Sequence, residues 1–323
     1  MELDTLDKRI IAELDRDCRA SNSDIARKLR INKNVVNYRL NNLEKNATIR
    51  GYYTIIDTYK LGYSSYRAYL KLQYAGPEKQ KEIMDYLVSV SSVWWAGSIQ
   101  GHFNIAVLVW AKNQKEFVDF WAAFNSRFRD NMAETVVSIY YGLEQYWLPF
   151  AKEILKRNAQ PDAIGVGNRV KIDETDAKLL KIIASNARAP LLEIAHQLRV
   201  TPAAVRYRLK QLIRKNVIVA FRVNVAMDKL GYTLYKASFN LKDMVAYPKM
   251  LQYARQAPNI YYVDKSIGWA DCEIEIYASS PAEFYNTMEK MRARFADSIR
   301  DFDFFAFSKI TKLLYVPADL EGR

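Results

Sequence analysis

Cysteine and histidine are scarce in this sequence. The chain of 323 residues has two cysteines, Cys18 and Cys272, and two histidines, His102 and His196. Two isolated thiols predict neither a disulfide framework nor a zinc site, and they are typical of a reducing cytoplasm. Two unpaired histidines limit general-base chemistry, and no phosphate-binding loop, metal cluster or Ser-His-Asp set accompanies them. We therefore expect no metal and no bound cofactor.

Long apolar runs are also absent. No stretch approaches the roughly 18 apolar residues that a membrane-spanning helix needs. Residues 1–7 are polar and lack the apolar run of a signal peptide, so we expect a cytoplasmic protein without a membrane span. What the sequence has instead is positive charge, with 48 Lys and Arg against 36 Asp and Glu and a formal net charge of +12. Such an excess favours nucleic acid or an acidic membrane surface as a partner.

The chain is a tandem repeat. Residues of the first copy return 169 positions later without a gap, from Asp4 and Asp173 to Tyr63 and Tyr232. After a drift of two residues the copies realign, from Gly101 and Gly268 onward. Repetition of this kind indicates two versions of one structural plan.

The first segment of each copy has the pattern of a winged helix-turn-helix domain. Helical spacing of apolar residues predicts helices over residues 4–14, 22–29 and 32–46, and the second copy repeats them. Its third helix has Thr201 as a capping residue and Pro202 at the first helical position. Aromatic and β-branched residues over 48–57 and 217–225 predict a β-ribbon or wing in each copy. Two short helices, a turn and a basic third helix are typical of DNA binding.

The second segment of each copy has the βαββαβ order of a ferredoxin-like domain. The predicted fold class is therefore α+β, with two winged helix-turn-helix domains and two ferredoxin-like domains in tandem. Helices on one face of such a sheet leave the other face uncovered, and we expect an aromatic face there, formed by Tyr66, Tyr69, Tyr141, Tyr146, Tyr235, Phe304 and Phe305. The two sheets should pack face to face as an intrachain pseudo-dimer. Helical faces and free sheet edges predict higher homo-oligomers.

Five segments follow from the repeat. They are a first DNA-binding domain (1–63), a first effector and dimerisation domain (64–150), a linker (151–170), a second DNA-binding domain (171–232) and a second effector and dimerisation domain (233–323). The linker begins with a helical pattern and ends in a region that contains proline and glycine.

Outward positions of the third helices are candidate DNA contacts. They are Lys33, Asn34, Asn37, Arg39 and Asn41 in the first copy, and Thr201, Pro202, Arg206, Arg208 and Lys210 in the second. Asparagine pairs with adenine and arginine with guanine, whereas the lysines, Arg39 and Arg208 suit phosphate. Tyr38 and Tyr207 recur, and we interpret them as core residues, with groove contact as the alternative.

The two third helices differ, so they should not prefer the same bases. One chain that binds one site with both helices predicts an asymmetric site with half-sites about 10 bp apart. If two chains instead place identical third helices on one site, that site should be a palindrome.

Turns between the central strands are the candidate effector site. Their residues are Ser98, Gln100, Gly101, Asn104, Ser266, Gly268 and Asp271. Asp or Asn beside glycine N–H groups suits an amino or carboxylate group, although turns also use these residues for conformational reasons.

The chain resembles the Lrp/AsnC, or feast/famine, regulators. The resemblance is carried by L-D-x-L-D-x-x-I-I at 3–11, I-A-R-K-L at 25–29, V-x-Y-R-L-x-x-L at 36–43 and 205–212, L-G-Y at 61–63, G-H-F-N at 101–104 and G-W-A-D at 268–271. It implies a transcriptional regulator that binds double-stranded DNA, with dimerisation and small-molecule sensing, commonly of amino acids, in the second segment. Asn104 departs from the Asp typical of that position.

The sequence is also compatible with two other functions. Siroheme decarboxylases share this two-domain plan, and some are tandem chains. Their Tyr-Arg-Arg segment and W-P-Y-N-L stretch are missing from the central strands here, so we expect no enzyme. An architectural protein that coats DNA with little sequence preference is the other alternative, because phosphate contacts alone give non-specific binding.

Overall fold

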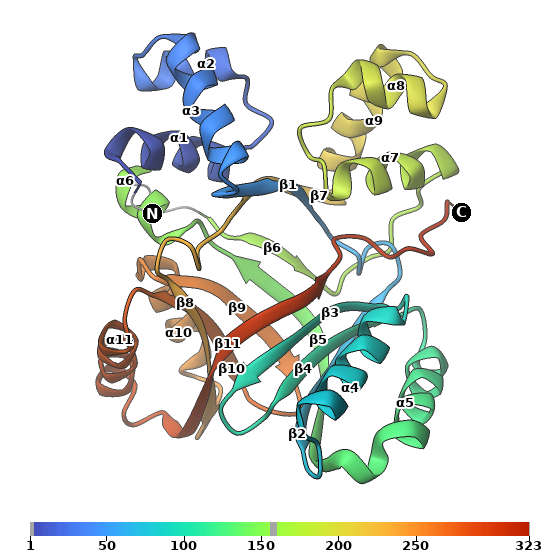
Figure 1. Cartoon of the computed structure of the whole chain (residues 1–323), viewed down its shortest axis with the longest axis vertical. Coiled ribbons are helices and arrows are strands. Elements are labelled where there is room, and N and C mark those ends of the chain that lie inside the picture. Colours follow the sequence, from blue (N-terminus) through green and yellow to red (C-terminus); the bar gives the residue numbers. More distant parts are fainter. Residues whose placement is uncertain (1–2, 156–159, 323) are drawn as a thin grey trace.

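The computed structural model describes residues 3–155 and 160–322. Two helix-turn-helix domains lie side by side above a β-structure that carries helices on its outer surface (Figure 1). The predicted α+β class and the order of the elements are confirmed. In the described part of the chain, no helix combines the length and the hydrophobicity needed to cross a membrane.

The helix-turn-helix domains begin their helices with side-chain caps. Their helices are α1 (Thr5–Arg16), α2 (Asn22–Leu29) and α3 (Lys33–Lys45), and α7 (Glu174–Ala184), α8 (Leu191–Leu198) and α9 (Pro202–Arg214). Asn32 caps α3, and the Thr201 hydroxyl accepts the N–H of Ala204 at 3.2 Å, which confirms the predicted start of α9 at Pro202. Arg30 and Arg199 adopt the left-handed conformation at equivalent turns, with φ of 56° and 54°. The turn sets the direction of the third helix relative to the second in each domain.

The two predicted wings form one ribbon. Strand β1 (Ile49–Ile56) and strand β7 (Ile218–Val225) pair with each other in antiparallel register, with Tyr53 opposite Arg222. Both predicted strands are present, and they pair with each other across the copies. Each strand finds its hydrogen-bonding partner in the other copy, which joins the two DNA-binding domains along their backbones.

The ferredoxin-like segments have the predicted elements. The first comprises β2 (Ser64–Leu72), α4 (Pro77–Ser89), β3 (Val93–Gln100), β4 (Ile105–Ala111), α5 (Gln114–Phe128), the short 3₁₀ helix Arg129–Asn131 and β5 (Met132–Gln145). The second comprises β8 (Thr233–Leu241), α10 (Tyr247–Gln256), β9 (Ile260–Ile267), β10 (Cys272–Ala278), α11 (Pro281–Arg294) and β11 (Ile299–Leu313).

The two sheets join at both edges. Their strand order is β2-β4-β3-β11-β8-β10-β9-β5-β6, and β2 also pairs with β5, which closes a barrel. The joints between copies are β3 with β11 and β5 with β9, both antiparallel. The sheets thus face each other as expected, but the prediction of free sheet edges is wrong, because each edge strand is paired with the other copy. Higher homo-oligomers through the outer helices stay a prediction.

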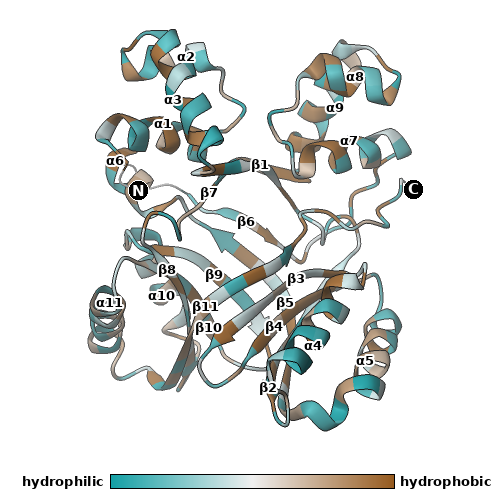
Figure 2. Ribbon diagram, viewed as in Figure 1, coloured by the Kyte–Doolittle hydropathy of each residue, from teal (hydrophilic) through white to brown (hydrophobic). Residues whose placement is uncertain are grey.

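Aromatic residues divide between the two faces of the sheets. Tyr66 stacks on Phe117 of α5 and Tyr235 stacks on Phe284 of α11, each with ring centroids 4.2 Å apart. These two tyrosines therefore belong to the outer layer, which corrects their predicted place between the sheets. Figure 2 shows the outer helices α4 and α11 with polar surfaces turned away from the sheets.

The segment between the copies is docked at both ends. Helix α6 (Pro149–Leu155) packs against α1, and strand β6 (Asp162–Gly165) pairs with β5. Within the predicted linker, residues 156–159 lie outside the described residues. Both docked pieces contact elements of the first copy.

A buried ion cluster joins this segment to the ribbon. Arg222 of β7 donates to the Asp15 carbonyl at 2.6 Å and to the Asp162 carboxylate at 2.7 Å, and Asp15 Oδ2 accepts the N–H of Leu148 at 2.7 Å. The Arg222 side chain is 1% exposed. Because two carboxylates converge on one buried guanidinium, loss of that guanidinium would leave both of them uncompensated.

We expect Arg222→Met to lower the free energy of unfolding by about 3–5 kcal/mol, the usual cost of breaking a buried ion pair. Arg50→Met is the matched control, since Arg50 pairs with Asp228 at an exposed position of the same ribbon. The control should cost at most about 1 kcal/mol. Urea unfolding followed by tryptophan fluorescence measures both, and equal losses would contradict this role of Arg222.

Candidate nucleic-acid interface and internal chamber

The recognition helices, α3 and α9, present free polar side chains. Lys33, Asn34 and Asn41 are exposed on α3, and Arg206 and Lys210 are exposed on α9. Within the described residues, none of these side chains makes a hydrogen bond or an ion pair. They are therefore available to phosphates and base edges.

Two tyrosines belong to the same exposed surfaces. Tyr38 is 68% exposed and Tyr207 is 64% exposed, so their interpretation as core residues is wrong. Tyr38 is four residues after Asn34 and three before Asn41, which places all three on one helix face. The repetition of tyrosine on an otherwise polar helix face was the sequence signal for this position.

Five of the predicted DNA contacts also have structural roles. Arg39 pairs with Asp4 and with Asp7, the latter at 3.0 Å, and Arg208 pairs with Asp173 and Asp176, both at 2.7 Å. These ion pairs hold each recognition helix against the first helix of its domain, and the phosphate contacts of Arg39 and Arg208 stay a prediction. Asn37 accepts a hydrogen bond from Asn22 at 2.7 Å, and Thr201 is occupied as the cap of α9. Pro202 begins that helix and offers no donor.

Reciprocal contacts fix the two helix-turn-helix domains to each other. Arg19 donates to the Ala187 carbonyl at 2.5 Å, and its repeat equivalent Arg188 donates to the Cys18 carbonyl at 2.9 Å. Lys60 and its equivalent Lys229 make the same kind of exchange, donating to the Lys215 and Asn46 carbonyls, each at 3.1 Å. Lys215 and Asn46 end α9 and α3, so these ammonium groups also meet the negative ends of the helix dipoles. The pairs impose a pseudo-twofold arrangement on the recognition helices.

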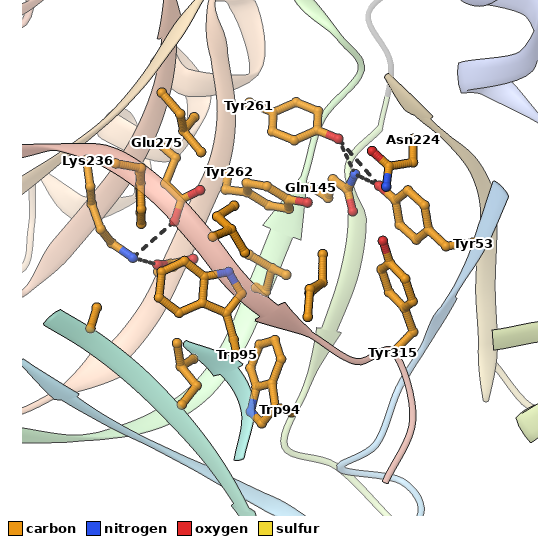
Figure 3. A pocket seen from close by; sticks show the side chains of 18 of the residues that line it. Tyr53, Trp94, Trp95, Gln145, Asn224, Lys236, Tyr261, Tyr262, Glu275 and Tyr315 are labelled. Carbon is orange, nitrogen blue, oxygen red and sulfur yellow. Dashed lines mark hydrogen bonds and ion pairs between the residues drawn. The ribbon is translucent and has the colours of Figure 1, made fainter. Parts of the chain in front are cut away.

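A chamber of about 840 Å³ lies inside the barrel, beneath the ribbon. Both copies contribute to its wall, and many of the lining residues are aromatic, among them Tyr53, Trp94, Trp95, Tyr262 and Tyr315 (Figure 3). Its rim includes Ile310, which is 45% exposed, and the exposed ion pair of Arg50 with Asp228, so the chamber opens to solvent. Its volume falls within the range of small-molecule sites, about 300–1,000 Å³.

Two buried cations stand at equivalent positions in the chamber wall. Arg67 of β2 pairs with Glu273 and donates to Ser266 at 3.0 Å. Lys236 of β8, its repeat equivalent, pairs with Asp264 and with Glu275 Oε1, the latter at 3.2 Å. These side chains are mostly or wholly buried, so each charge depends on its partners for the solvation that water would otherwise supply.

The carboxyl of Glu275 has a raised pKa. Burial raises the pKa of this carboxyl to about 7, while the Lys236 ammonium opposes the rise and the Asp264 carboxylate adds to it. Other titratable groups that interact with it are Arg67, Tyr140, Tyr262 and Tyr277. Its side chain keeps 13% exposure because it borders the chamber.

The predicted effector turns are occupied by structural contacts. Asn104 and Asp271 accept the N–H groups of Leu72 and Leu241, both at 2.8 Å. A Cβ atom on Gly101 would lie 2.7 Å from the Phe305 side chain, and one on Gly268, where φ is +131°, would lie 2.9 Å from the Val137 carbonyl. These contacts account for four of the seven residues, and an effector site at the turns stays a prediction.

The other three turn residues are in different surroundings. Gln100 is exposed and Ser98 accepts a hydrogen bond from Ser308 through its carbonyl at 3.0 Å, whereas Ser266 belongs to the buried cluster with Arg67. Of the described turn residues, none lines the chamber. The sequence signal for the chamber was a charged residue at equivalent places in two strands, Arg67 and Lys236, together with alternating charge at Glu273 and Glu275.

Comparison with known proteins agrees with this architecture. The winged helix-turn-helix DNA-binding family matches residues 3–46 and again residues 172–219, so the chain carries two domains of that class. The transcriptional regulator LysM of Sulfurisphaera tokodaii is 40% identical over 122 residues, which are 38% of this chain and 86% of LysM. LysM of Saccharolobus solfataricus is 26% identical over 128 residues, 40% of this chain and 88% of that protein. Each relative corresponds to about one copy.

The chain belongs to the Lrp/AsnC family of helix-turn-helix transcriptional regulators. Among solved structures, the siroheme decarboxylase NirDL is similar over 96% of this chain and 93% of its own, with a TM-score of 0.66 and 13% identity. At that identity the likeness concerns the fold.

We expect Glu275→Gln to change how stability depends on pH. A carboxyl whose pKa is raised on folding holds more protons in the folded state, so its contribution to stability is lost as pH rises from about 4.5 through about 7. Between pH 5 and pH 8 the variant should gain about 1–3 kcal/mol relative to the unaltered protein. Unfolding curves at both values measure this gain, with the exposed Glu289→Gln on α11 as control. A constant difference would contradict the assigned pKa.

Proposed function

We propose that one chain regulates transcription by placing α3 and α9 in successive major grooves of a single, asymmetric DNA site. The observation that carries the proposal is the set of reciprocal contacts of Arg19, Arg188, Lys60 and Lys229, which fixes both helices in one pseudo-twofold unit. A fixed pair of recognition helices suits half-sites separated by about one helical turn, ~10 bp.

Differences between the helices support an asymmetric site. Arg206 is exposed on α9, whereas its equivalent on α3, Asn37, is half-buried and holds Asn22; Asn41 and Lys210 are exposed at equivalent positions. Asparagine side chains match the donor and acceptor pattern of adenine, whereas arginine matches guanine. The two half-sites should therefore differ in base composition.

We further propose that the chamber is the effector site and that it acts through the ribbon. Tyr53 of β1 and Asn224 of β7 both line the chamber (Figure 3). Strand β1 follows α3 after three residues, and β7 follows α9 after three residues. A ligand that contacts the ribbon thus acts on the short connections to both recognition helices, which is the physical link that an effector needs.

A catalytic role is the second candidate, favoured by the full-length likeness in fold to NirDL. Neither histidine lines the chamber: His102 lies in an exposed turn beside Glu134 at 2.7 Å, and His196 is exposed on α8. The relatives in sequence carry the names of transcriptional regulators. We therefore propose regulation rather than decarboxylation.

The first test is selection of bound fragments from a genomic DNA library by the whole protein at physiological salt. We expect a motif with two unlike half-sites about 10 bp apart, or a multiple of that spacing. A palindromic motif would contradict the use of both helices of one chain. Strong binding without any motif would favour the architectural alternative and overturn the proposal.

The second test separates base contacts from phosphate contacts on α9. Arg206→Ala should weaken binding to the selected site by about 1–3 kcal/mol and have little effect on random DNA. Lys210→Ala should weaken binding to both DNAs alike and reduce the salt slope by about one. Lys290→Ala, which removes one charge from the exposed face of α11, is the matched control. Equal losses on both DNAs for Arg206→Ala would contradict its assignment.

A further inference from the structure

The chamber contains one carboxylate oxygen that is not already engaged. Both oxygens of Asp264 accept hydrogen bonds, from Tyr140 and from Lys236 with Arg67. Both oxygens of Glu273 are also engaged, by Tyr69 at 3.0 Å and by Ser266 at 2.8 Å among others. Glu275 uses Oε1 for Lys236, and within the described residues Oε2 has no hydrogen-bonding partner. This oxygen is an acceptor that a ligand can use.

The buried ion cluster around Glu275 has one more carboxylate than it has cations. Two cations, Arg67 and Lys236, face three carboxylates, Asp264, Glu273 and Glu275. Lys236 divides its ammonium between Asp264 and Glu275. With every group ionised, this buried cluster carries one net negative charge, in surroundings where water is largely excluded. The other charged residues that line the chamber, Arg50, Asp228 and the exposed Lys309, lie outside the cluster. A ligand with one positive charge would neutralise it.

The rest of the wall suits flat rings. Trp95 and Tyr262 lie on the same side of the chamber as Glu275, and Tyr53 and Tyr315 lie towards the ribbon (Figure 3). Tyr53 and Tyr315 stack with ring centroids 4.5 Å apart. Aromatic faces attract both flat rings and organic cations, because the face of the ring is the negative end of its quadrupole.

We propose that the chamber binds a planar aromatic cation whose charged N–H group donates to Glu275 Oε2 and whose rings lie among Trp95, Tyr262 and the ribbon tyrosines. This assignment rests on the proposed sensing role of the chamber and names its ligand class. A charge-assisted hydrogen bond to a largely buried carboxylate gives the site its preference for cations, and the aromatic wall gives its preference for flat molecules.

Two acridines of the same shape and opposite charge test the proposal. Binding of 9-aminoacridine, a cation, and of acridine-9-carboxylate, an anion, is measured by calorimetry on the full chain without DNA at pH 8. We expect the cation to bind more tightly by about tenfold or more, the effect of one charge-assisted hydrogen bond. Equal affinities, or tighter binding of the carboxylate, would overturn the assignment.

Variants locate the binding site. Glu275→Gln should weaken the cation by about tenfold and should not weaken the carboxylate, whereas Trp95→Ala should weaken both. Glu289→Gln, an exposed position on α11, is the control for loss of one acidic charge. Binding of 9-aminoacridine that is unaffected by Glu275→Gln and Trp95→Ala would place the ligand elsewhere and refute the proposal.

The result is independent of DNA binding because no DNA is present. If the carboxylate binds and Trp95→Ala abolishes that binding, the chamber is a ligand site but the cation class is wrong. If neither acridine binds, this ligand class is rejected and the proposed DNA site is unaffected.

Discussion

Antiparallel pairing between the two copies is the constraint on which the rest of the structure depends. Backbone hydrogen bonds join β3 to β11 and β5 to β9, so neither sheet keeps the pair of free edges that a separate ferredoxin-like domain would have. Closure turns one face of every barrel strand into an interior. It also places β1 and β7 across the top of that interior, where they pair with each other. The spacing of the DNA-binding domains and the existence of the chamber thus have the same origin.

A tandem chain can distribute charge in this interior in a way that a symmetric dimer cannot. The inward carboxylates Asp264, Glu273 and Glu275 all belong to the second copy, and the equivalent residues of the first copy are Gly97, Ala106 and Leu108. In a dimer of identical chains every inward carboxylate would appear twice, and their mutual repulsion in a poorly solvated space would be severe. Duplication followed by divergence allows one acidic wall to face an apolar one, which is the geometry of a site for a single ligand.

The pattern of residues within each segment predicted the helices and strands. It could not predict which distant segment each of them packs against. Helix bounds such as Pro202–Arg214 follow from a capping residue, a proline and apolar spacing within one segment, so they could be predicted. The ribbon, the barrel closure and the outward stacking of Tyr66 and Tyr235 depend on which distant segment lies opposite, and alternation along a strand is the same for either choice. The ion pairs of Arg39 and Arg208 were missed for a related reason, because their aspartate partners lie on another helix.

The two copies have identical residues at positions whose side chains fix the fold. They have different residues at positions that contact DNA or a ligand in the proposed function. Arg19 and Arg188, Arg39 and Arg208, and Lys60 and Lys229 are identical pairs, and each pair makes the same contact in both halves. Exposed positions of the recognition helices and inward positions of the barrel differ between copies, as in the exposed pair Asn41 and Lys210. A symmetric framework fixes two binding surfaces at a constant separation, and unlike surfaces on that framework can distinguish the two ends of one asymmetric target. The same reasoning applies to the chamber, where a pseudo-twofold barrel holds one charged wall and one apolar wall and so fixes a single orientation for its ligand.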